Sequence, residues 1–298
     1  MGMGLKKLSN NGRKDVRAFY DQIGWKMESD GFYQNARYED LRPVSREYID
    51  NCHLRINRHL VKDGKYLLDA GSGPIQYPAY LTYMEGYQYR VCADISIVAL
   101  KEARNRIKQR GLFVVCDVAD MPFKSDTMDG IVSLHTLHHL PLPDQKKAYY
   151  DLYRTLKPGK KAAVVNGWTE SALMKKWFWL VKLMEKISYQ FKKLGGGVKI
   201  SSAGKTQSDQ SRKQTSIQTG TFVEKLNEQW LIKELPEIPF SIFVWRSVSV
   251  RFMRAVIHAM LAGKLWLKIL YWLEEKNPRF YGINGQYPLI VIHKPEEE

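Results

Sequence analysis

The sequence predicts an α/β protein with a doubly wound, mostly parallel sheet of seven strands, an N-terminal helical cap and helical insertions in its C-terminal half. Three observations lead to this prediction. Short apolar runs alternate with helical stretches between residues 64 and 166, which is typical of a parallel sheet. The first run leads into an acidic residue and a Gly-x-Gly turn at residues 69–73, where such sheets bind ligands. Two further strand-like runs follow near the C-terminus.

The N-terminal region, residues 1–62, is expected to form the cap or lid. Residues 13–62 have the pattern of helices separated by polar breaks. The chain begins without the apolar segment of a secretory signal, and Lys6 stands where a myristoylation signal has Ser or Thr. We therefore expect a cytoplasmic protein that is neither exported nor acylated.

Residues 63–170 carry the repeating pattern of the predicted ligand-binding core. Ser96 can cap a helix over residues 96–109, which contain good helix formers. The crossover between the first two runs is only weakly patterned as a helix. The five strand-like runs are Tyr66–Ala70, Tyr89–Ala93, Leu112–Cys116, Gly130–Leu134 and Lys161–Asn166.

Residues 171–239 are expected to form an amphipathic helix and a flexible insertion. Apolar residues recur every three or four positions over residues 173–194, with lysines largely off that stripe, which predicts a basic amphipathic helix. Lysines interrupt it too often for a bilayer-spanning segment, so it either packs on the domain or lies in a membrane interface. Residues 195–220 are rich in Gly, Ser, Thr, Gln and Lys and are predicted to be a mobile loop.

Residues 240–298 are expected to supply the last strands of the sheet, with one more helical insertion between them. A short helix at Thr221–Leu231 precedes this region. The predicted elements within it are a strand at Phe240–Val250, an aromatic and basic helix at Met253–Glu275 and a terminal strand at Tyr287–His293.

Composition narrows the range of partners. The formal net charge is +15, which attracts anions such as nucleic acid, acidic lipid head groups or phosphorylated substrates. A solvated basic surface without such a partner is the plainer interpretation. Cys52, Cys92 and Cys116 have no metal-binding spacing, so we expect reduced thiols and no metal site.

The turn at residues 69–73 favours one kind of nucleotide over another. A dinucleotide site uses Gly-x-Gly-x-x-Gly, but Gln76 occupies the third glycine position after Gly71 and Gly73. The carboxylate of Asp69 would repel a pyrophosphate, whereas it suits a ligand that carries an amino group. The turn therefore points away from NAD and towards S-adenosylmethionine.

Further motifs between residues 64 and 166 agree with this ligand in order and spacing. They are Leu68-Asp69-Ala70-Gly71-Ser72-Gly73, Asp94 after Val91-Cys92-Ala93, Asp117 within Val115–Phe123, Leu137-His138-His139-Leu140, and Leu156-Lys157-Pro158-Gly159. This region resembles the class I S-adenosylmethionine-dependent methyltransferases of the small-molecule (UbiE/type 11-like) branch, and the resemblance implies their Rossmann-like fold. Pro74 departs from the pattern, because many members have another glycine there.

The resemblance implies a cofactor site at the ends of the first three strands. Asp69 would hold the ammonium of the methionine part, Asp94 would accept both ribose hydroxyls, and Asp117 would accept the adenine amino group. Each aspartate alone is equally typical of a helix cap or turn, but three at the ends of parallel strands favour a binding site. The residues expected to bind the cofactor are Asp69, Gly71, Ser72, Gly73, Asp94, Ile95, Asp117, Val118, His135 and Tyr20.

Three histidines follow the fourth predicted strand. His135 and His138 are the catalytic candidates, because neutral imidazole can take a proton from a hydroxyl or amine nucleophile. A metal site would need carboxylate or sulfur ligands near them, which the sequence does not offer. Arginines and aromatic residues of the cap are candidates for gripping an anionic acceptor. The acceptor candidates are Tyr33, Arg37, Tyr38, Arg42, Arg46 and His139.

The predicted activity is methyl transfer from S-adenosylmethionine, which leaves S-adenosylhomocysteine, to a small-molecule, lipid, quinone or lipid-linked glycan acceptor. The basic amphipathic segments place this enzyme on the inner face of a membrane. Two other interpretations stay open. One is an RNA-modifying methyltransferase that uses the basic surface, although the chain lacks a recognisable RNA-binding module and the Asn/Asp-Pro-Pro-Tyr/Phe motif of base methyltransferases. The other is a non-catalytic scaffold that binds the cofactor.

Overall fold

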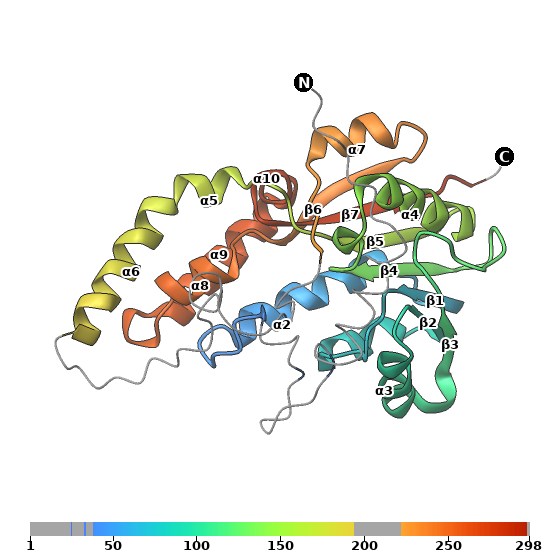
Figure 1. Cartoon of the computed structure of the whole chain (residues 1–298), viewed down its shortest axis with the longest axis horizontal. Coiled ribbons are helices and arrows are strands. Elements are labelled where there is room, and N and C mark those ends of the chain that lie inside the picture. The colour runs from blue at the N-terminus through green and yellow to red at the C-terminus, as the bar shows by residue number, and fades with distance from the viewer. Residues whose placement is uncertain (1–24, 26–32, 34–37, 194–221, 297–298) are drawn as a thin grey trace, which may run out of the picture.

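The protein is built around a seven-stranded sheet (Figure 1). The computed structural model describes residues 25, 33, 38–193 and 222–296. The strand order is β3-β2-β1-β4-β5-β7-β6. The strands are β1 (Gly64–Ala70), β2 (Tyr87–Asp94), β3 (Gly111–Val115), β4 (Gly130–Leu134), β5 (Lys161–Val165), β6 (Phe240–Arg246) and β7 (Tyr287–His293).

The strand directions confirm the predicted fold class. Strands β1 to β5 pair in parallel, and β7 runs antiparallel to both of its neighbours, β5 and β6. The order reverses between β1 and β4, which form the switch point of the sheet. Doubly wound sheets bind ligands beyond the carboxyl ends of the strands at this point.

Helices cover both faces of the sheet. Figure 1 shows α4 and α7 on one face and α2 and α3 on the other. Successive strand residues serve the two faces alternately, so that Leu67 packs in one apolar core and Leu68 in the other. The α-helices are α2 (Arg46–Leu54), α3 (Ile97–Ile107), α4 (Leu142–Thr155), α5 (Ala172–Lys176), α6 (Phe178–Lys193), α7 (Glu228–Glu234), α8 (Val250–Val256), α9 (Gly263–Lys276) and α10 (Pro278–Asn284).

The two long helices predicted in the C-terminal half are each broken. The segment 173–194 divides at Trp177 into α5 and α6. The segment Met253–Glu275 divides into α8, a 3₁₀ turn at Ala259–Leu261 and α9. The chain folds back on itself here: the N–H of Gly263 donates to the carbonyl of His258 at 2.9 Å. A side chain at position 263 would meet that carbonyl at 2.7 Å, so the close approach depends on glycine.

Capping side chains explain two further differences from the prediction. The strand predicted at Phe240–Val250 ends at Arg246, because the Oγ of Ser249 accepts a hydrogen bond from the N–H of Phe252 at 3.1 Å and starts α8. The helix predicted at Thr221–Leu231 begins only after Asn227, whose side chain caps α7.

The first crossover also differs from an ordinary βαβ unit. Between β1 and β2 the chain forms a 3₁₀ helix at Pro78–Met84, which accounts for the weak helical pattern there. The crossover between β2 and β3 agrees with the prediction, since Ser96 caps α3 by accepting a hydrogen bond from the N–H of Ala99.

Other expectations can be placed on the same fold. Cys52 and Cys92 are buried and Cys116 is half-buried, all three as free thiols. The residues described contain no cluster of His, Cys, Asp and Glu suited to a metal ion. In that same part of the chain, no helix has the length and apolar character needed to span a bilayer. The predictions for residues 195–220 and for most of the cap before residue 38 lie outside the described residues.

Candidate active site

A cavity of about 590 Å³ lies beyond the carboxyl ends of β1, β2 and β4. Binding sites for small molecules and cofactors are typically of this size. Its lining falls into two parts. The turn end is formed by Asp69, Gly71, Ser72, Gly73, Asp94, Ile95, Cys116, Asp117 and Val118, and the aromatic end by Glu39, Tyr77, Tyr80, His135, His138, Trp245, Arg246 and Tyr287.

The glycines of the turn are required by its backbone. Gly71 and Gly73 have φ angles of +76° and +52°, a region that other residues rarely adopt. A Cβ atom at Gly71 would lie 2.2 Å from the side chain of Thr136, and one at Gly73 would lie 2.9 Å from Trp25. Glycine is therefore required at both positions by the backbone angles and by the packing of Thr136 and Trp25, and the turn lines the cavity.

Two of the predicted aspartates line the cavity, and each also stabilises a local turn. The carboxylate of Asp94 accepts hydrogen bonds from the N–H groups of Gly73 and Ser96, each at 2.8 Å. The Oδ1 atom of Asp117 accepts a hydrogen bond from the N–H of Ala119 at 2.9 Å. Both side chains line the cavity, so the turn-stabilising role and the ligand-facing position occur together.

Asp69 has a partner that the sequence analysis missed. The guanidinium of Arg90, fully buried on the neighbouring strand, donates to Oδ2 of Asp69 from Nε at 3.0 Å and from its second terminal nitrogen at 2.5 Å. Its third nitrogen donates to the carbonyl of Tyr80. The pair neutralises the charge of Asp69 and fixes the carboxylate at the cavity wall. An arginine inside the apolar run of β2 was the sequence signal for such a pair, because buried charges need partners.

The histidines that follow β4 lie in the cavity as predicted, but burial weakens them as bases. His135 adopts φ +55°, a left-handed conformation that side-chain-bearing residues rarely adopt and that is often found at functional sites. Burial, with a further contribution from Arg246, lowers the pKa of His135 to about 3. Burial and the neighbouring His139 lower the pKa of His138 well below its usual range. Both rings are therefore neutral at physiological pH.

Strand β6 delivers two side chains to the aromatic end. The pairing of β6 with β7 is irregular between Val244 and Arg246, and such a bulge lets consecutive residues face the same side. Trp245 and Arg246 consequently both line the cavity. The ring of Trp245 lies 4.8 Å from that of His135 and 5.9 Å from that of Tyr287, between centres. These residues escaped the sequence analysis, which treated β6 only as a strand.

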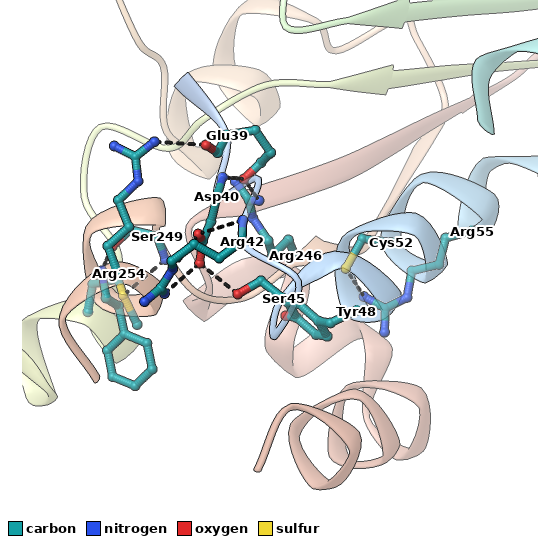
Figure 2. A network of polar contacts seen from close by, with 12 residues as sticks. Glu39, Asp40, Arg42, Ser45, Tyr48, Cys52, Arg55, Arg246, Ser249 and Arg254 are labelled. Carbon is teal, nitrogen blue, oxygen red and sulfur yellow. Dashed lines mark hydrogen bonds and ion pairs between the residues drawn. The ribbon is translucent and has the colours of Figure 1, made fainter. Parts of the chain in front are cut away.

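A short segment before α2, residues 38–45, is fastened across this end of the cavity, and we call it the strap. Figure 2 shows its polar contacts. Arg246 donates to the carboxylate of Glu39, and Arg254 donates to the carbonyl of Glu39 at 2.8 Å. Arg42 binds Asp40 through two hydrogen bonds of 2.7 Å and also reaches the carbonyl of Met253 at 2.8 Å. The strap thus joins α2 to β6 and α8.

The acceptor candidates proposed from the cap are only partly placed at the cavity. Tyr38 and His139 line it. Arg42 does not, because its guanidinium is used to hold the strap. Arg46 is exposed on α2 and Tyr33 is buried against Trp25, both away from the lining. Tyr20 and Arg37 lie outside the described residues. The structure does not bring Arg42 and Arg46 into the cavity lining, where the lysine and arginine residues of the described part of the chain are Lys225 and Arg246.

Comparison with known proteins gives the same class. Residues 68–164 match the family described as "Methyltransferase domain". The chain is 28% identical over 167 residues to the methyltransferase GfsG of Streptomyces halstedii, covering 51% of this chain and 58% of that protein. It is 29% identical over 139 residues to the ubiquinone/menaquinone biosynthesis C-methyltransferase UbiE of Marinomonas sp. (strain MWYL1), covering 44% and 55%. The chain thus spans little more than half the length of these relatives.

A solved structure extends the similarity to the whole fold. The geranyl diphosphate C-methyltransferase of Streptomyces coelicolor A3(2) superposes with a TM-score of 0.51 over 95% of this chain and 97% of that one, at 13% identity. The fold and the site define a class I methyltransferase domain. Residues 68–164 are a methyltransferase domain similar to those of the UbiE/type 11 branch, and the cofactor of such a domain is S-adenosylmethionine.

Proposed function

We propose that the protein transfers a methyl group from S-adenosylmethionine to a small-molecule or lipid-like acceptor. The observation that carries this proposal is one cavity in which the glycine turn, Asp94 and Asp117 adjoin a chamber walled by aromatic rings. A cofactor site alone would suit a scaffold equally well. The adjoining chamber supplies space for an acceptor next to the cofactor.

The residues at the turn end fit the cofactor. The methionine part would lie against the backbone of Gly71 and Gly73, which lines the cavity, and Oδ1 of Asp69 would accept its ammonium while Arg90 holds Oδ2. Asp94 would accept the ribose hydroxyls and Asp117 the adenine amino group. Ser72, Ile95, Val118 and His135 would supply the remaining contacts. These roles are the ones that the family resemblance implies.

In this reaction the main task of the protein is to align the acceptor with the methyl group of the cofactor. The bound cofactor supplies a methyl group already activated by its sulfonium charge, so positioning and exclusion of water can provide most of the rate. Neutral His135 and His138 line the chamber where an acceptor would meet that methyl group. Because the pKa of each ring is lowered, both are weak bases. They are suited to hydrogen-bonding the acceptor and to accepting a proton briefly, and not to deprotonating a weak acid completely.

The acceptor chamber favours an apolar, ring-containing or chain-like molecule. Its walls carry the rings of Tyr77, Tyr80, Trp245 and Tyr287, and the charged side chains of Arg246 and Glu39 lie among them. The curated relative from Marinomonas acts in quinone biosynthesis, which agrees with such a chamber. A quinone, lipid or lipid-linked glycan is therefore the proposed acceptor class.

The outer helices support an acceptor drawn from a membrane. Trp179 on α6 and Trp266 and Trp272 on α9 are each more than half exposed, and exposed lysines lie beside them at 182, 186, 264 and 268. Exposed tryptophan with lysine is the composition of an interfacial helix. We propose that this end of the molecule rests on the inner face of an anionic membrane.

Labelled methyl transfer tests the proposed function. The purified protein should bind S-adenosylmethionine and S-adenosylhomocysteine, and it should move label from the former into the lipid or small-molecule fraction of a cell extract. Asp94→Ala should weaken cofactor binding by about tenfold to a hundredfold, as expected for a lost pair of hydrogen bonds to ribose. Absence of cofactor binding would refute the proposal, and label confined to RNA would replace it with the RNA-modifying alternative.

A further inference from the structure

The aromatic end of the cavity contains a buried cation that the proposed methyl transfer has not used. Arg246 is 1% exposed and lines the cavity. Its guanidinium carbon lies 4.5 Å from the ring centre of Tyr287 and 5.1 Å from that of Trp245. These cation–π contacts hold the charge in one place. Arg246 is therefore a fixed, desolvated cation in the chamber proposed for the acceptor.

The hydrogen bonds of Arg246 are incomplete. One terminal nitrogen donates to Oε1 of Glu39. The Nε–H is buried and has no hydrogen-bond acceptor among the described residues. A buried donor without an acceptor costs about 1–3 kcal/mol, and an oxygen atom of a ligand in the cavity would remove that cost. Arg246 therefore keeps hydrogen-bonding capacity beyond its bond to Glu39, at the wall of the cavity.

The groups near Arg246 include a second cation, Lys225, which acts on His135 and His138. Lys225 lines the same cavity, and the nearby histidines are neutral, since burial lowers the pKa of His135 to about 3. Glu39 is the carboxylate beside Arg246, while Asp144, also in the lining, is paired with Lys147. The other carboxylates of the lining are those of Asp69, Asp94 and Asp117 at the turn end, where Asp69 is paired with Arg90.

We propose that Arg246 binds an acidic oxygen, a carboxylate or phenolate, on a planar acceptor whose ring lies among Trp245, Tyr287 and His135. This inference rests on the proposed function and names the chemistry of its acceptor. Ring stacking would orient the acceptor plane, and the guanidinium would fix its rotation, so that one ring edge faces the methyl group.

The carboxylate of Glu39 should weaken the binding of such an acidic acceptor. Its carboxylate would lie beside the acidic oxygen of the acceptor, and like charges at such distances repel. Because the strap carries Glu39, the same contact that fastens the strap lowers the affinity of Arg246 for an anion. Loss of the Glu39 charge and loss of the Arg246 charge should consequently change anion binding in opposite directions, whereas a purely structural ion pair would make both variants alike.

Binding of benzoate and benzamide to the protein saturated with S-adenosylhomocysteine tests the proposal. The two probes share a planar ring and differ in charge, and ligands of their size bind at about 1–10 mM when they fit. We expect benzoate to bind in this range by ligand-observed NMR and benzamide at least fivefold more weakly. Arg246→Met should abolish benzoate binding, Arg246→Lys should weaken it, and Glu39→Gln should strengthen it severalfold.

Arg42→Met is the matched control, since it disturbs the strap network without lining the cavity. It should leave benzoate binding within twofold of the original protein. Three outcomes would overturn the inference: equal binding of the two probes, no binding of either probe, or benzoate binding that persists in Arg246→Met. Affinity for S-adenosylhomocysteine is measured on the same samples. If the original protein does not bind S-adenosylhomocysteine, the proposed function itself fails; if it binds it normally, only the inference about Arg246 is overturned.

Discussion

At the scale of single residues, burial determines which groups can titrate. His53 is 1% exposed and its ring lies 4.8 Å from Tyr77 and 5.4 Å from Trp245, between centres. Neither ring nitrogen has a hydrogen-bond partner among the described residues. Burial, with a contribution from Arg246, lowers the pKa of His53 to about 3. The folded protein therefore holds this ring neutral well below the pH at which an exposed histidine gains a proton.

This pKa predicts a pH-dependent loss of stability. In the unfolded chain His53 takes up a proton below pH 6.5, whereas in the folded protein it does so only near pH 3. Its contribution to the free energy of unfolding is thus complete above pH 6.5 and falls as the pH drops towards 3. Between pH 7 and 5 the loss amounts to about 2 kcal/mol.

His53→Phe should remove that loss while keeping a ring in the cluster. Urea unfolding at pH 7 and pH 5 should show a difference about 2 kcal/mol smaller in the variant than in the original protein. Tyr80→Phe alters the same cluster without removing an imidazole, and its difference should match the original. An unchanged pH difference in His53→Phe would show that His53 is protonated in the fold.

At the scale of elements, the sequence predicts the sheet better than the helices around it. The five core strands were predicted within three residues at each end, because buried parallel strands are continuous apolar runs bounded by turns. The strand predicted at Phe240–Val250 was too long, because Val248 and Val250 favour a strand while a single serine ends it. The bulge at Trp245 could not be predicted from the pattern of apolar residues. Both the bulge and the Arg90–Asp69 pair depend on how neighbouring strands align, which the sequence pattern does not reveal. The acceptor chamber could therefore be recognised only in the structure.

The serine that ends this strand gives an element-scale prediction. Ser249→Ala removes the hydroxyl that accepts the N–H of Phe252 at the start of α8. We expect the free energy of unfolding to fall by about 1 kcal/mol, measured by urea unfolding. Ser249→Asp keeps an N-cap acceptor and should restore most of the loss. Equal destabilisation by both substitutions would show that packing around Ser249, rather than the cap, matters there.

At the scale of the whole molecule, the exposed tryptophans of the described residues gather at the α5–α6 junction, on α6 and on α9. Figure 1 shows α6, α8 and α9 extending together from the sheet, at the end away from β3 and α3. Arg251 of α8 forms an ion pair with Glu185 of α6 at 2.9 Å, and Val250 at the start of α8 lines the cavity. The helices that expose tryptophan and lysine are therefore connected directly to the wall of the acceptor chamber. This arrangement suits an enzyme that takes its acceptor from a lipid surface.

Vesicle flotation tests that arrangement. The protein should float with vesicles containing about a third phosphatidylglycerol at low salt and should be released by high salt, because each lysine near an anionic surface contributes about 1 kcal/mol. Trp266→Ala with Trp272→Ala should weaken binding by about a hundredfold, from roughly 1.5 kcal/mol of apolar burial per side chain. Ile97→Ala, at an exposed apolar residue of α3, should leave binding unchanged. If the protein stays unbound at low salt, or the tryptophan variant binds as well as the original, the acceptor must reach the chamber from solution instead, and the exposed helices must serve a different partner.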